Sequence, residues 1–253
     1  MRRLTFDSSS NFPVWSVDSQ RVTFQSAREG DRGLWSQFVD GRAAERLTKS
    51  EKDETHQPES WSPDGKHLLY SILKGSTYAL WVYSTDSKKS EPFGHVTSTE
   101  TFSATFSPDG RWIAYAFSER AGGVGSPNRG VYVEPFPFTG EKHQAPKIAL
   151  DYHPVWSRDG TSILYIPGAN RPAVAVPIVT RPAIAFGTPT PPAHGPFPAL
   201  LSIEGRGYDV LPGGRFVTVS LASGEGLAGA NQGSELRVVL NWFEELTRLA
   251  AAK

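Results

Sequence analysis

The sequence predicts an all-β protein: a single β-propeller domain over residues 1–253, built from five four-stranded antiparallel blades. Two observations lead to this prediction. A short aromatic turn motif recurs at nearly constant spacing, and each copy is followed by a strand in which apolar residues alternate. A third observation, a match between the two ends of the chain, indicates that the N- and C-terminal strands pair and close the ring.

The turn motif is an aromatic residue followed by Ser-x-Asp and usually by Gly. Its copies lie at residues 15–19, 61–65, 106–110 and 156–160, and a degenerate copy lies at 210–214. Consecutive copies are 45 to 54 residues apart, which fits a four-stranded blade and is too long for an ankyrin or leucine-rich repeat. The aromatic residue is expected to end an inner strand, and the residues after it turn the chain back.

Four aspartates occupy the same position of the turn motif: Asp18, Asp64, Asp109 and Asp159. We interpret them as structural turn residues, because an Asp carboxylate accepts nearby backbone N–H groups and the following Gly permits positive φ. They are not expected to share a metal ion, since equivalent positions of different blades are spread around a ring.

The strand after each turn carries apolar residues four and six positions beyond the aspartate position. These residues are Val22 and Phe24, Leu68 and Tyr70, Ile113 and Tyr115, Ile163 and Tyr165, and Val217 and Val219. Apolar residues two apart indicate a strand with one buried face. Third strands are expected at Gly33–Val39, Tyr78–Thr85, Gly130–Pro135, Ala173–Ile178 and Leu236–Trp242, and outer strands at Glu45–Thr48, Pro92–Thr97, Lys147–Leu150 and Ala183–Gly187.

The two ends of the chain complement each other. No outer strand follows Leu236–Trp242, whereas Arg3-Leu4-Thr5 repeats Arg46-Leu47-Thr48, the end of an expected outer strand. The first residues therefore fit as the fourth strand of the last blade, which would remove the open sheet edges that a propeller must avoid. The long, poorly patterned stretch Ala183–Gly205 leaves a six-bladed ring as the alternative.

The composition excludes several classes of protein. The 26 Lys and Arg residues offset 26 Asp and Glu residues, which argues against a nucleic-acid partner, and the absence of Cys excludes disulfides and thiol nucleophiles. No apolar run reaches the about 18 residues of a membrane span, and polar residues 7–10 stand where a signal peptide needs an apolar core. We therefore expect a soluble chain, cytoplasmic by default and extracytoplasmic if it belongs to a larger membrane-anchored protein.

The sequence motifs assign no catalytic, cofactor-binding or metal-binding residue. Residues 224–229 have the glycine spacing of a dinucleotide site, but a strand is expected after them instead of the helix that would hold a phosphate, and we interpret them as a loop. Ser71-Ile72-Leu73-Lys74 matches Ser-x-x-Lys without its companion motifs, and neither Gly-x-Ser-x-Gly nor His-Glu-x-x-His occurs.

Polar residues just before the inner strands are the candidate ligand-binding residues, because propellers usually line a central funnel there. They are Asn11, His56, Gln57, Thr101, Asp151, Tyr152, His153 and Arg206. Convergent His, Asp and Arg side chains at a channel mouth suit a small polar ligand, a peptide end or a cation. The alternative interpretation is that these residues are solvated strand ends without a ligand.

The repeated turn resembles the PD40 or TolB-like propeller repeat, which is related to the WD40 repeat, over nearly the whole chain. In addition, Arg206-Gly207-Tyr208-Asp209-Val210 and the run from Leu236 to Leu246 resemble the end of propeller regions in bacterial proteins. Those regions follow a serine/threonine protein kinase domain or a winged-helix regulator domain. The chain contains no kinase motif, so the resemblance implies a sensor or protein-interaction role without kinase activity, as part of a longer parent protein.

Three hypotheses about function follow. The first is a non-catalytic bacterial signalling scaffold that binds a protein or peptide partner through its funnel face. The second is a small-molecule hydrolase or lyase that uses funnel residues with a divalent cation. The third is a spacer left by gene fragmentation, without a ligand of its own. The sequence favours the first, because only Asp151, His153 and His56 offer an acidic or histidine cluster.

Overall fold

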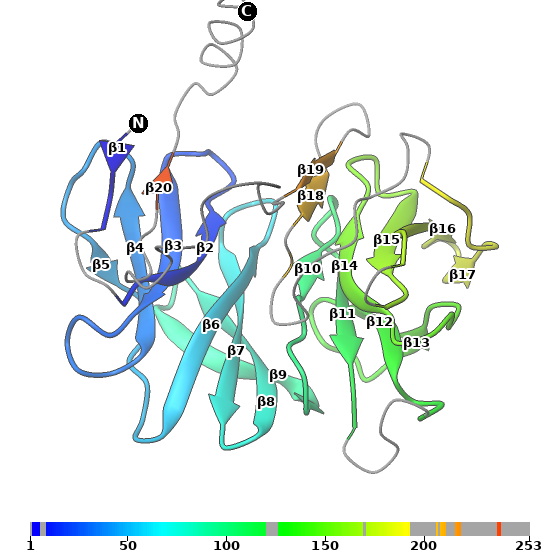
Figure 1. Cartoon of the computed structure of the whole chain (residues 1–253), viewed down its shortest axis with the longest axis horizontal. Helices are drawn as coiled ribbons and strands as arrows, with labels where there is room; N and C mark the ends of the chain where they lie inside the picture. Colours follow the sequence, from blue (N-terminus) through cyan, green and yellow to red (C-terminus); the bar gives the residue numbers. More distant parts are fainter. Residues whose placement is uncertain are drawn as a thin grey trace, which may run out of the picture.

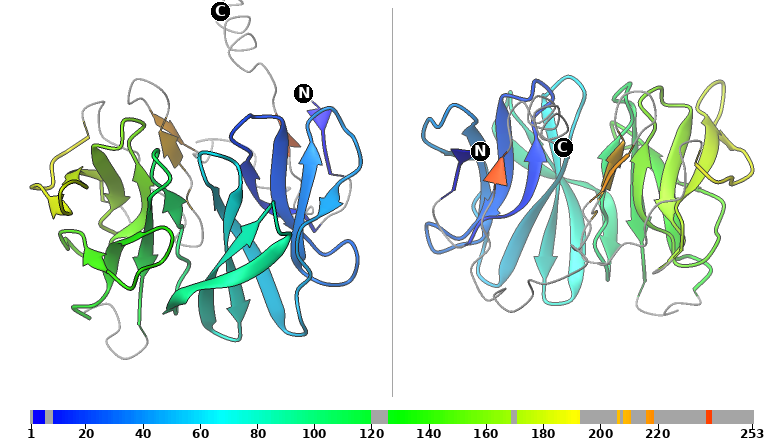
Figure 2. Two further views of the ribbon diagram at one scale, coloured as in Figure 1. Left: turned by 180° about the vertical axis from the view of Figure 1, so that it is seen from behind. Right: turned by 45° about the horizontal axis from the view of Figure 1, so that its top comes forward.

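The structure is a computed structural model that describes residues 2–5, 9–119, 126–168, 171–192, 206, 208–210, 216–218 and 237–238. Within these residues the chain forms four complete four-stranded antiparallel sheets and two shorter strand pairs. Each complete sheet is one blade, and its strands are hydrogen-bonded in chain order. The blades follow one another side by side, as Figures 1 and 2 show.

The strands of the four complete blades have the following bounds. Blade 1 contains β2 (Asn11–Trp15), β3 (Arg21–Ser26), β4 (Gly33–Phe38) and β5 (Glu45–Arg46). Blade 2 contains β6 (Glu54–Trp61), β7 (His67–Lys74), β8 (Thr77–Ser84) and β9 (Lys89–Ser98). Blade 3 contains β10 (Thr105–Phe106), β11 (Trp112–Phe117), β12 (Gly130–Pro135) and β13 (His143–Gln144). Blade 4 contains β14 (Tyr152–Trp156), β15 (Ser162–Ile166), β16 (Val174–Val179) and β17 (Ala185–Phe186).

The two ends of the chain pair with each other, as the sequence predicted. β1 (Arg2–Arg3) is antiparallel to β20 (Arg237–Val238), with Arg2 opposite Val238 and Arg3 opposite Arg237. The second short pair joins β18 (Tyr208–Val210) to β19 (Phe216–Thr218). The choice of five blades over six stays a prediction, because residues 193–205 lie outside the described residues. Val219, the rest of the degenerate turn at 211–214 and the glycine stretch 224–229 also lie outside them.

Every turn motif in the four complete blades makes the same hydrogen bonds. In blade 2, Ser62 Oγ donates to Asp64 Oδ1 at 2.5 Å, and the backbone N–H of Lys66 donates to the same oxygen at 3.0 Å. The N–H of His67 donates to Ser62 Oγ at 2.9 Å, and Gly65 has a φ of 71°. Equivalent bonds from Ser to Asp measure 2.6 Å at Asp18, Asp109 and Asp159. The aspartate therefore closes the turn that joins an inner strand to the second strand.

The apolar core lies between neighbouring blades. Because side chains alternate along a strand, Tyr115 and Tyr132 of blade 3 pack against blade 2, whereas Ala114 and Val131 pack against blade 4. Leu69, Leu80 and Phe93 of blade 2 pack against the face of blade 3 that carries Tyr115 and Tyr132. The second strands carry the predicted buried residues: Val22, Phe24, Leu68, Tyr70, Ile113, Tyr115, Ile163 and Tyr165. Radial stacking of this kind lets each sheet bury both faces.

One predicted outer strand is wrong. The sequence placed the outer strand of blade 3 at Lys147–Leu150, but the structure has β13 at His143–Gln144, opposite Val133 and Tyr132. The chain turns soon after β12 and pairs at once. Pro146 lacks the N–H that would continue the ladder. In the segment 147–150, the N–H groups of Ile148 and Ala149 donate to the Asp151 carboxylate instead of to a strand.

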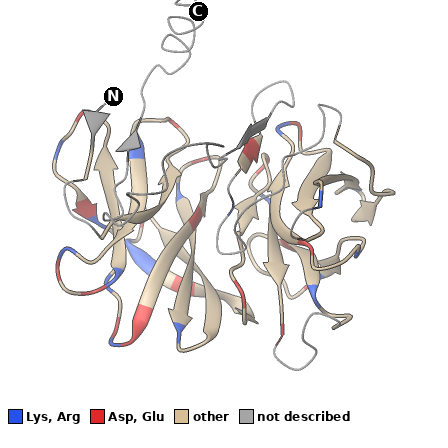
Figure 3. Ribbon diagram, viewed as in Figure 1, with Lys and Arg blue, Asp and Glu red and all other residues tan. Residues whose placement is uncertain are grey.

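The described residues contain no helix long and apolar enough to cross a membrane. Basic and acidic residues are interspersed over the blades and their connections (Figure 3). This distribution agrees with the balanced charge of the sequence.

Candidate functional site at the ends of the inner strands

The inner strands carry irregularities at equivalent positions. The pairing register shifts between Asn11 and Val14 in β2, between Pro58 and Ser60 in β6, and between Tyr152 and Val155 in β14. Phe12, Ser103 and His153 have φ values of 53°, 47° and 53°, a left-handed conformation that is uncommon for residues other than Gly. Bulges of this kind redirect side chains and are frequent next to binding sites. The inner strands therefore combine regular turns at one end with irregular, polar segments at the other.

Glu59 is the most distinctive residue of these segments. Its Oε2 accepts the backbone N–H of Ala104 from blade 3 at 3.0 Å, and its Oε1 accepts Ser71 Oγ at 2.8 Å. Burial raises the pKa of Glu59 to about 7, although both hydrogen bonds and the charge of Arg206 act in the opposite direction. A carboxyl group with such a pKa changes its charge near neutral pH, which is a property of many functional sites.

His153 is connected to this carboxylate through the adjacent residues Ser103 and Ala104. Its Nδ1 is 2.7 Å from Ser103 Oγ, and Ser103 immediately precedes Ala104, the residue that binds Glu59. The backbone carbonyl of His153 accepts the Tyr208 hydroxyl. Both His153 and Ser103 are buried. The contacts therefore run from blade 2 through blades 3 and 4 to β18.

Arg206 reaches the same region from the chain segment before β18. Its Nη1 donates to the backbone carbonyl of Pro154 at 3.3 Å, and its charge opposes the rise that burial causes in the pKa of Glu59. Glu59 of β6, His153 of β14 and Arg206, which precedes β18, are thus connected through these contacts. We call Glu59, Ser103, His153, Arg206 and Tyr208 the axial cluster.

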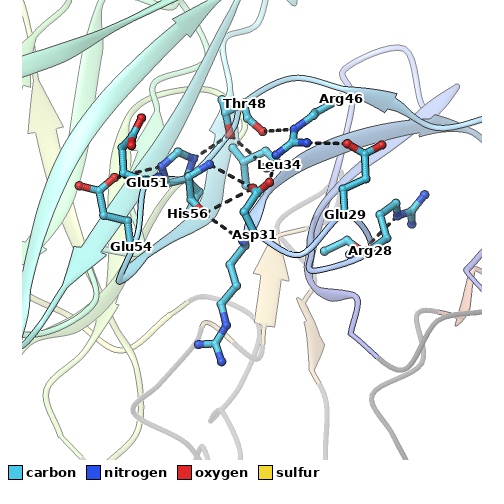
Figure 4. A network of polar contacts seen from close by, with 12 residues as sticks. Arg28, Glu29, Asp31, Leu34, Arg46, Thr48, Glu51, Glu54 and His56 are labelled. Atoms are coloured by element: carbon cyan, nitrogen blue, oxygen red, sulfur yellow. Dashed lines mark hydrogen bonds and ion pairs between the residues drawn. The ribbon is translucent and has the colours of Figure 1, made fainter.

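His56 lies apart from the axial cluster. Its side chain is 3% exposed, and its Nδ1 is 2.7 Å from Thr48 Oγ1 of blade 1 (Figure 4). Burial lowers the pKa of His56 to about 4, against the opposing effect of Glu54, so the ring is neutral near pH 7. Its backbone N–H donates to the carbonyl of Arg32 at 3.0 Å. The structure therefore places His56 in the contact between blades 1 and 2.

The same contact contains a network of charges. Arg46 pairs with Asp31, and its Nη1 is 2.6 Å from Glu29 (Figure 4). Asp31 also accepts the backbone N–H of Ser50 at 3.1 Å. The hydrogen bonds and charge of Arg46 and the bonds from Ser50 outweigh burial and lower the pKa of Asp31. These groups satisfy one another, and they tie the connection between the second and third strands of blade 1 to its outer strand and to the segment that follows.

Two further candidates, Asp151 and Tyr152, belong to the contact between blades 3 and 4. Asp151 is buried and accepts the N–H groups of Ile148 and Ala149 at 3.0 and 3.2 Å. The guanidinium of Arg129 lies 4.9 Å from the centre of the Tyr152 ring. Arg129 is also buried, and its Nη1 is 2.8 Å from Glu100 Oε1. Both candidates therefore have structural partners.

The remaining candidates, Asn11, Gln57 and Thr101, are half-buried. Asn11 stands opposite Gln25 at the start of β2, and Gln57 stands opposite Ser71 in β6. Thr101 precedes β10. Of the eight residues that the sequence singled out, only His153 and Arg206 thus belong to the axial cluster. Glu59 was missed, and the signal that could have found it is a charged residue where the neighbouring inner strands have Pro13, Ala104 and Pro154.

No group of three or more His, Cys, Asp or Glu side chains in the described part of the chain could hold a metal ion. The axial cluster instead offers one carboxylate, one guanidinium and one imidazole. Such a set can bind peptide carbonyls, carboxylates and amines through hydrogen bonds and charge.

The described architecture, blades of four antiparallel strands joined through the chain ends, defines the protein as a β-propeller. Comparison with known proteins shows which β-propellers this chain is similar to. The protein TolB of the Tol-Pal system from Anaeromyxobacter dehalogenans strain 2CP-C is 31% identical over 91 residues, which cover 35% of this chain and 20% of that protein. No family model matches the chain.

Solved structures agree with this similarity. TolB from Acinetobacter baumannii matches with a TM-score of 0.56 and 19% identity, over 72% of this chain and 44% of that chain. An oligogalacturonate lyase from Vibrio parahaemolyticus matches with a TM-score of 0.55 and 12% identity, over 75% of this chain and 56% of that chain. The chain therefore has the fold of a TolB-like β-propeller. It matches about a fifth of the length of its curated relative.

Proposed function

We propose that this chain is a non-catalytic binding scaffold that engages a protein or peptide partner through the axial cluster, as the sensor part of a larger bacterial signalling protein. The observation that carries the proposal is the Glu59 carboxylate, held between Ala104 and Ser71 within the field of Arg206. A carboxylate within the field of a guanidinium offers a peptide both an acceptor and donors. The similarity to TolB supports a scaffold role.

The chemistry of the cluster indicates how a partner would bind. Arg206 has five N–H donors in a fixed geometry, which match a carboxylate or peptide carbonyls. Its bond to the Pro154 carbonyl holds the guanidinium in place before a partner arrives. Since a positioned side chain loses little entropy on binding, Arg206 is the residue whose removal should weaken binding most.

A pull-down from bacterial lysate with a matched set of variants tests this proposal. The wild-type chain should retain a partner that Arg206→Ala and Glu59→Gln lose. Arg111→Ala is the matched control, because Arg111 is an exposed Arg in the turn at the opposite ends of the strands, bound to Asp109. If all variants retain the same partners, the axial cluster is not the binding surface.

The alternative is a lyase, and the structural similarity to oligogalacturonate lyase favours it over other enzyme classes. In a β-elimination, Glu59 with its pKa of about 7 would act as the base and Arg206 would neutralise the substrate carboxylate. Incubation with acidic oligosaccharides and a divalent cation tests this alternative. A conjugated, ultraviolet-absorbing product that Glu59→Gln abolishes would favour the lyase over the scaffold.

A further inference from the structure

A second site lies between blades 2 and 3. A cavity of about 620 Å³ is lined by Val96, Thr97, Ser98 and neighbouring residues of blade 2 and by Phe117, Glu134 and Lys142 of blade 3, among others. No residue of the axial cluster lines it. A ligand of this cavity would therefore be independent of the function proposed above.

Glu134 is the buried carboxylate of this cavity. Its residue is 2% exposed, and one carboxylate oxygen accepts the hydroxyl of Tyr115. The other oxygen has no hydrogen-bond partner among the described residues. Burial raises the pKa of Glu134. A buried carboxylate oxygen without a partner is costly unless a charge compensates it, so its presence calls for a cation nearby.

The repeat itself does not require a carboxylate at this position. Glu134 stands opposite Ile113, the apolar residue four positions after the turn aspartate. The residues at the equivalent position in the other complete blades are Gln37, Tyr83 and Val176. Blade 3 therefore differs from its neighbours at the point where it lines the cavity.

Lys142 is the cation whose charge acts most strongly on Glu134. Its ammonium nitrogen lies 4.1 Å from the centre of the Tyr132 ring, 4.2 Å from that of Phe117 and 5.8 Å from that of Tyr115. It forms no hydrogen bond or ion pair with any residue that the structure describes. Its pKa is lowered by burial, against the opposing charge of Glu134. Ring faces and a nearby carboxylate are the groups that recognise organic ammonium ions.

The position of Lys142 in the chain allows its side chain to move away from the rings. It belongs to the connection between β12 and β13, and its residue as a whole is exposed although the ammonium group lies over the rings. The connection also contains Gly140 with a φ of 89°. A flexible side chain on an exposed connection can withdraw by changing rotamers, without moving a strand. The rings and Glu134 would stay in place, because they belong to β11 and β12.

We propose that this cavity binds an organic ammonium group and that Lys142 occupies the site in the ligand-free chain. The ammonium group comes from a free small cation or from a lysine side chain of a partner. In both cases the incoming ammonium group replaces Lys142 over the faces of Tyr132 and Phe117 and compensates the negative charge of the Glu134 carboxylate.

Calorimetric titration with choline tests the proposal. Lys142→Ala should bind choline at least tenfold more tightly than the wild type, because the rings are then unoccupied. Lys142→Met is the matched control, since its side chain refills the space over the rings without a charge and should bind no more tightly than the wild type. Lys66→Ala removes an exposed Lys that does not line the cavity and should leave binding unchanged.

A second variant pair tests the site itself. Glu134→Gln and Phe117→Leu, each combined with Lys142→Ala, should lose the gain in affinity. Thermal unfolding shows which double variants fold, and one folded double variant is enough for this test. If Lys142→Ala binds choline no more tightly than the wild type, or if a folded double variant keeps the gain, the proposal is wrong.

Two peptides distinguish the sources of the ammonium group. Acetyl-Ala-Lys-Ala-amide is compared with the same peptide carrying norleucine in place of Lys. Binding of choline alone by Lys142→Ala supports a free small cation. Binding of the lysine peptide without the norleucine peptide supports the lysine of a partner. Equal binding of the two peptides contradicts recognition of an ammonium group.

Discussion

The carboxylate of Glu59 in β6 accepts the backbone N–H of Ala104 at 3.0 Å, so a side chain of blade 2 satisfies the main chain of blade 3. This bond lies beside the Ser103 hydroxyl that contacts His153 of blade 4. Neighbouring inner strands are thus joined by polar contacts at one end, in addition to the apolar packing between the sheets. These polar contacts between blades 2, 3 and 4 belong to the axial cluster.

Glu59→Gln should make the unfolding free energy of the protein less dependent on pH. Burial raises the pKa of Glu59 from an ordinary value of 4.5 to about 7, so the folded state binds a proton that the unfolded state has released. The stability linked to this proton is fully present below pH 4.5 and is lost as the pH rises through 7. Relative to the wild type, the variant should therefore gain unfolding free energy on the order of 3 kcal/mol between pH 4.5 and 8.

Urea unfolding at pH 4.5, 6 and 8 measures this difference. Glu91→Gln serves as a control, because Glu91 is an exposed carboxylate of β9. If Glu59→Gln and wild type keep a constant difference in unfolding free energy across this range, Glu59 does not titrate near pH 7.

Ser103→Ala should weaken the contact between blades 3 and 4. It removes the hydroxyl 2.7 Å from His153 Nδ1, and both residues are buried. Loss of one partner of a buried hydrogen bond costs about 1–3 kcal/mol. Ser87→Ala, in an exposed turn of blade 2, is the control and should change stability by less than about 0.5 kcal/mol. Equal effects of the two substitutions would show that the Ser103 contact contributes nothing.

Asp64→Ala should destabilise the turn of blade 2 at neutral pH by about 1 kcal/mol, because the carboxylate accepts both Ser62 Oγ and the Lys66 N–H. The bond from Ser62, followed by that from Lys66, lowers the pKa of Asp64 below 3.8. The stability linked to this carboxylate is therefore present above pH 3.8 and is lost as the pH falls through the lower, folded-state value. Wild type and variant should converge in unfolding free energy at the lowest pH. A difference that widens on acidification contradicts this role.

Deletion of residues 1–6 should lower the melting temperature by more than about 5 °C, because it removes the strand that pairs with β20 and exposes a sheet edge. A matched control keeps the strand and changes only its side chains, through Arg2→Thr and Arg3→Thr. Differential scanning calorimetry compares the two. A truncated chain that melts with the control would show that the N-terminal strand is dispensable.

The sequence was sufficient to predict the blades because their signals are local. An aromatic residue, Ser-x-Asp and alternating apolar residues are read within about ten residues, and the turn at Asp64 depends only on Ser62 and its own chain neighbours. The outer strand of blade 3 was misplaced because a two-residue strand carries no alternation. Its position depends on Pro146 and on the bonds that Asp151 makes to the preceding segment.

The candidate site was harder to predict, because its members are positioned by other blades. Position before an inner strand selected His153 and Arg206, which belong to the axial cluster, but the same rule also selected His56. Thr48 of the preceding blade holds His56 between the sheets, and no local pattern reveals that partner. Glu59 was missed because a single Glu inside a strand usually faces solvent, and only its contacts with Ala104 and Ser71 show otherwise.

Disulfide trapping of the terminal strands tests the closed ring most directly, since the natural chain has no Cys that could interfere. Arg2→Cys with Val238→Cys, and Arg3→Cys with Arg237→Cys, place thiols on residues that stand opposite each other in β1 and β20. At least one pair should oxidise rapidly to a disulfide and raise the melting temperature, and reduction of the disulfide should lower it again. The control pair, Arg3→Cys with Arg111→Cys, should stay reduced. If neither facing pair crosslinks faster than the control, the chain ends do not meet and the closed propeller is contradicted.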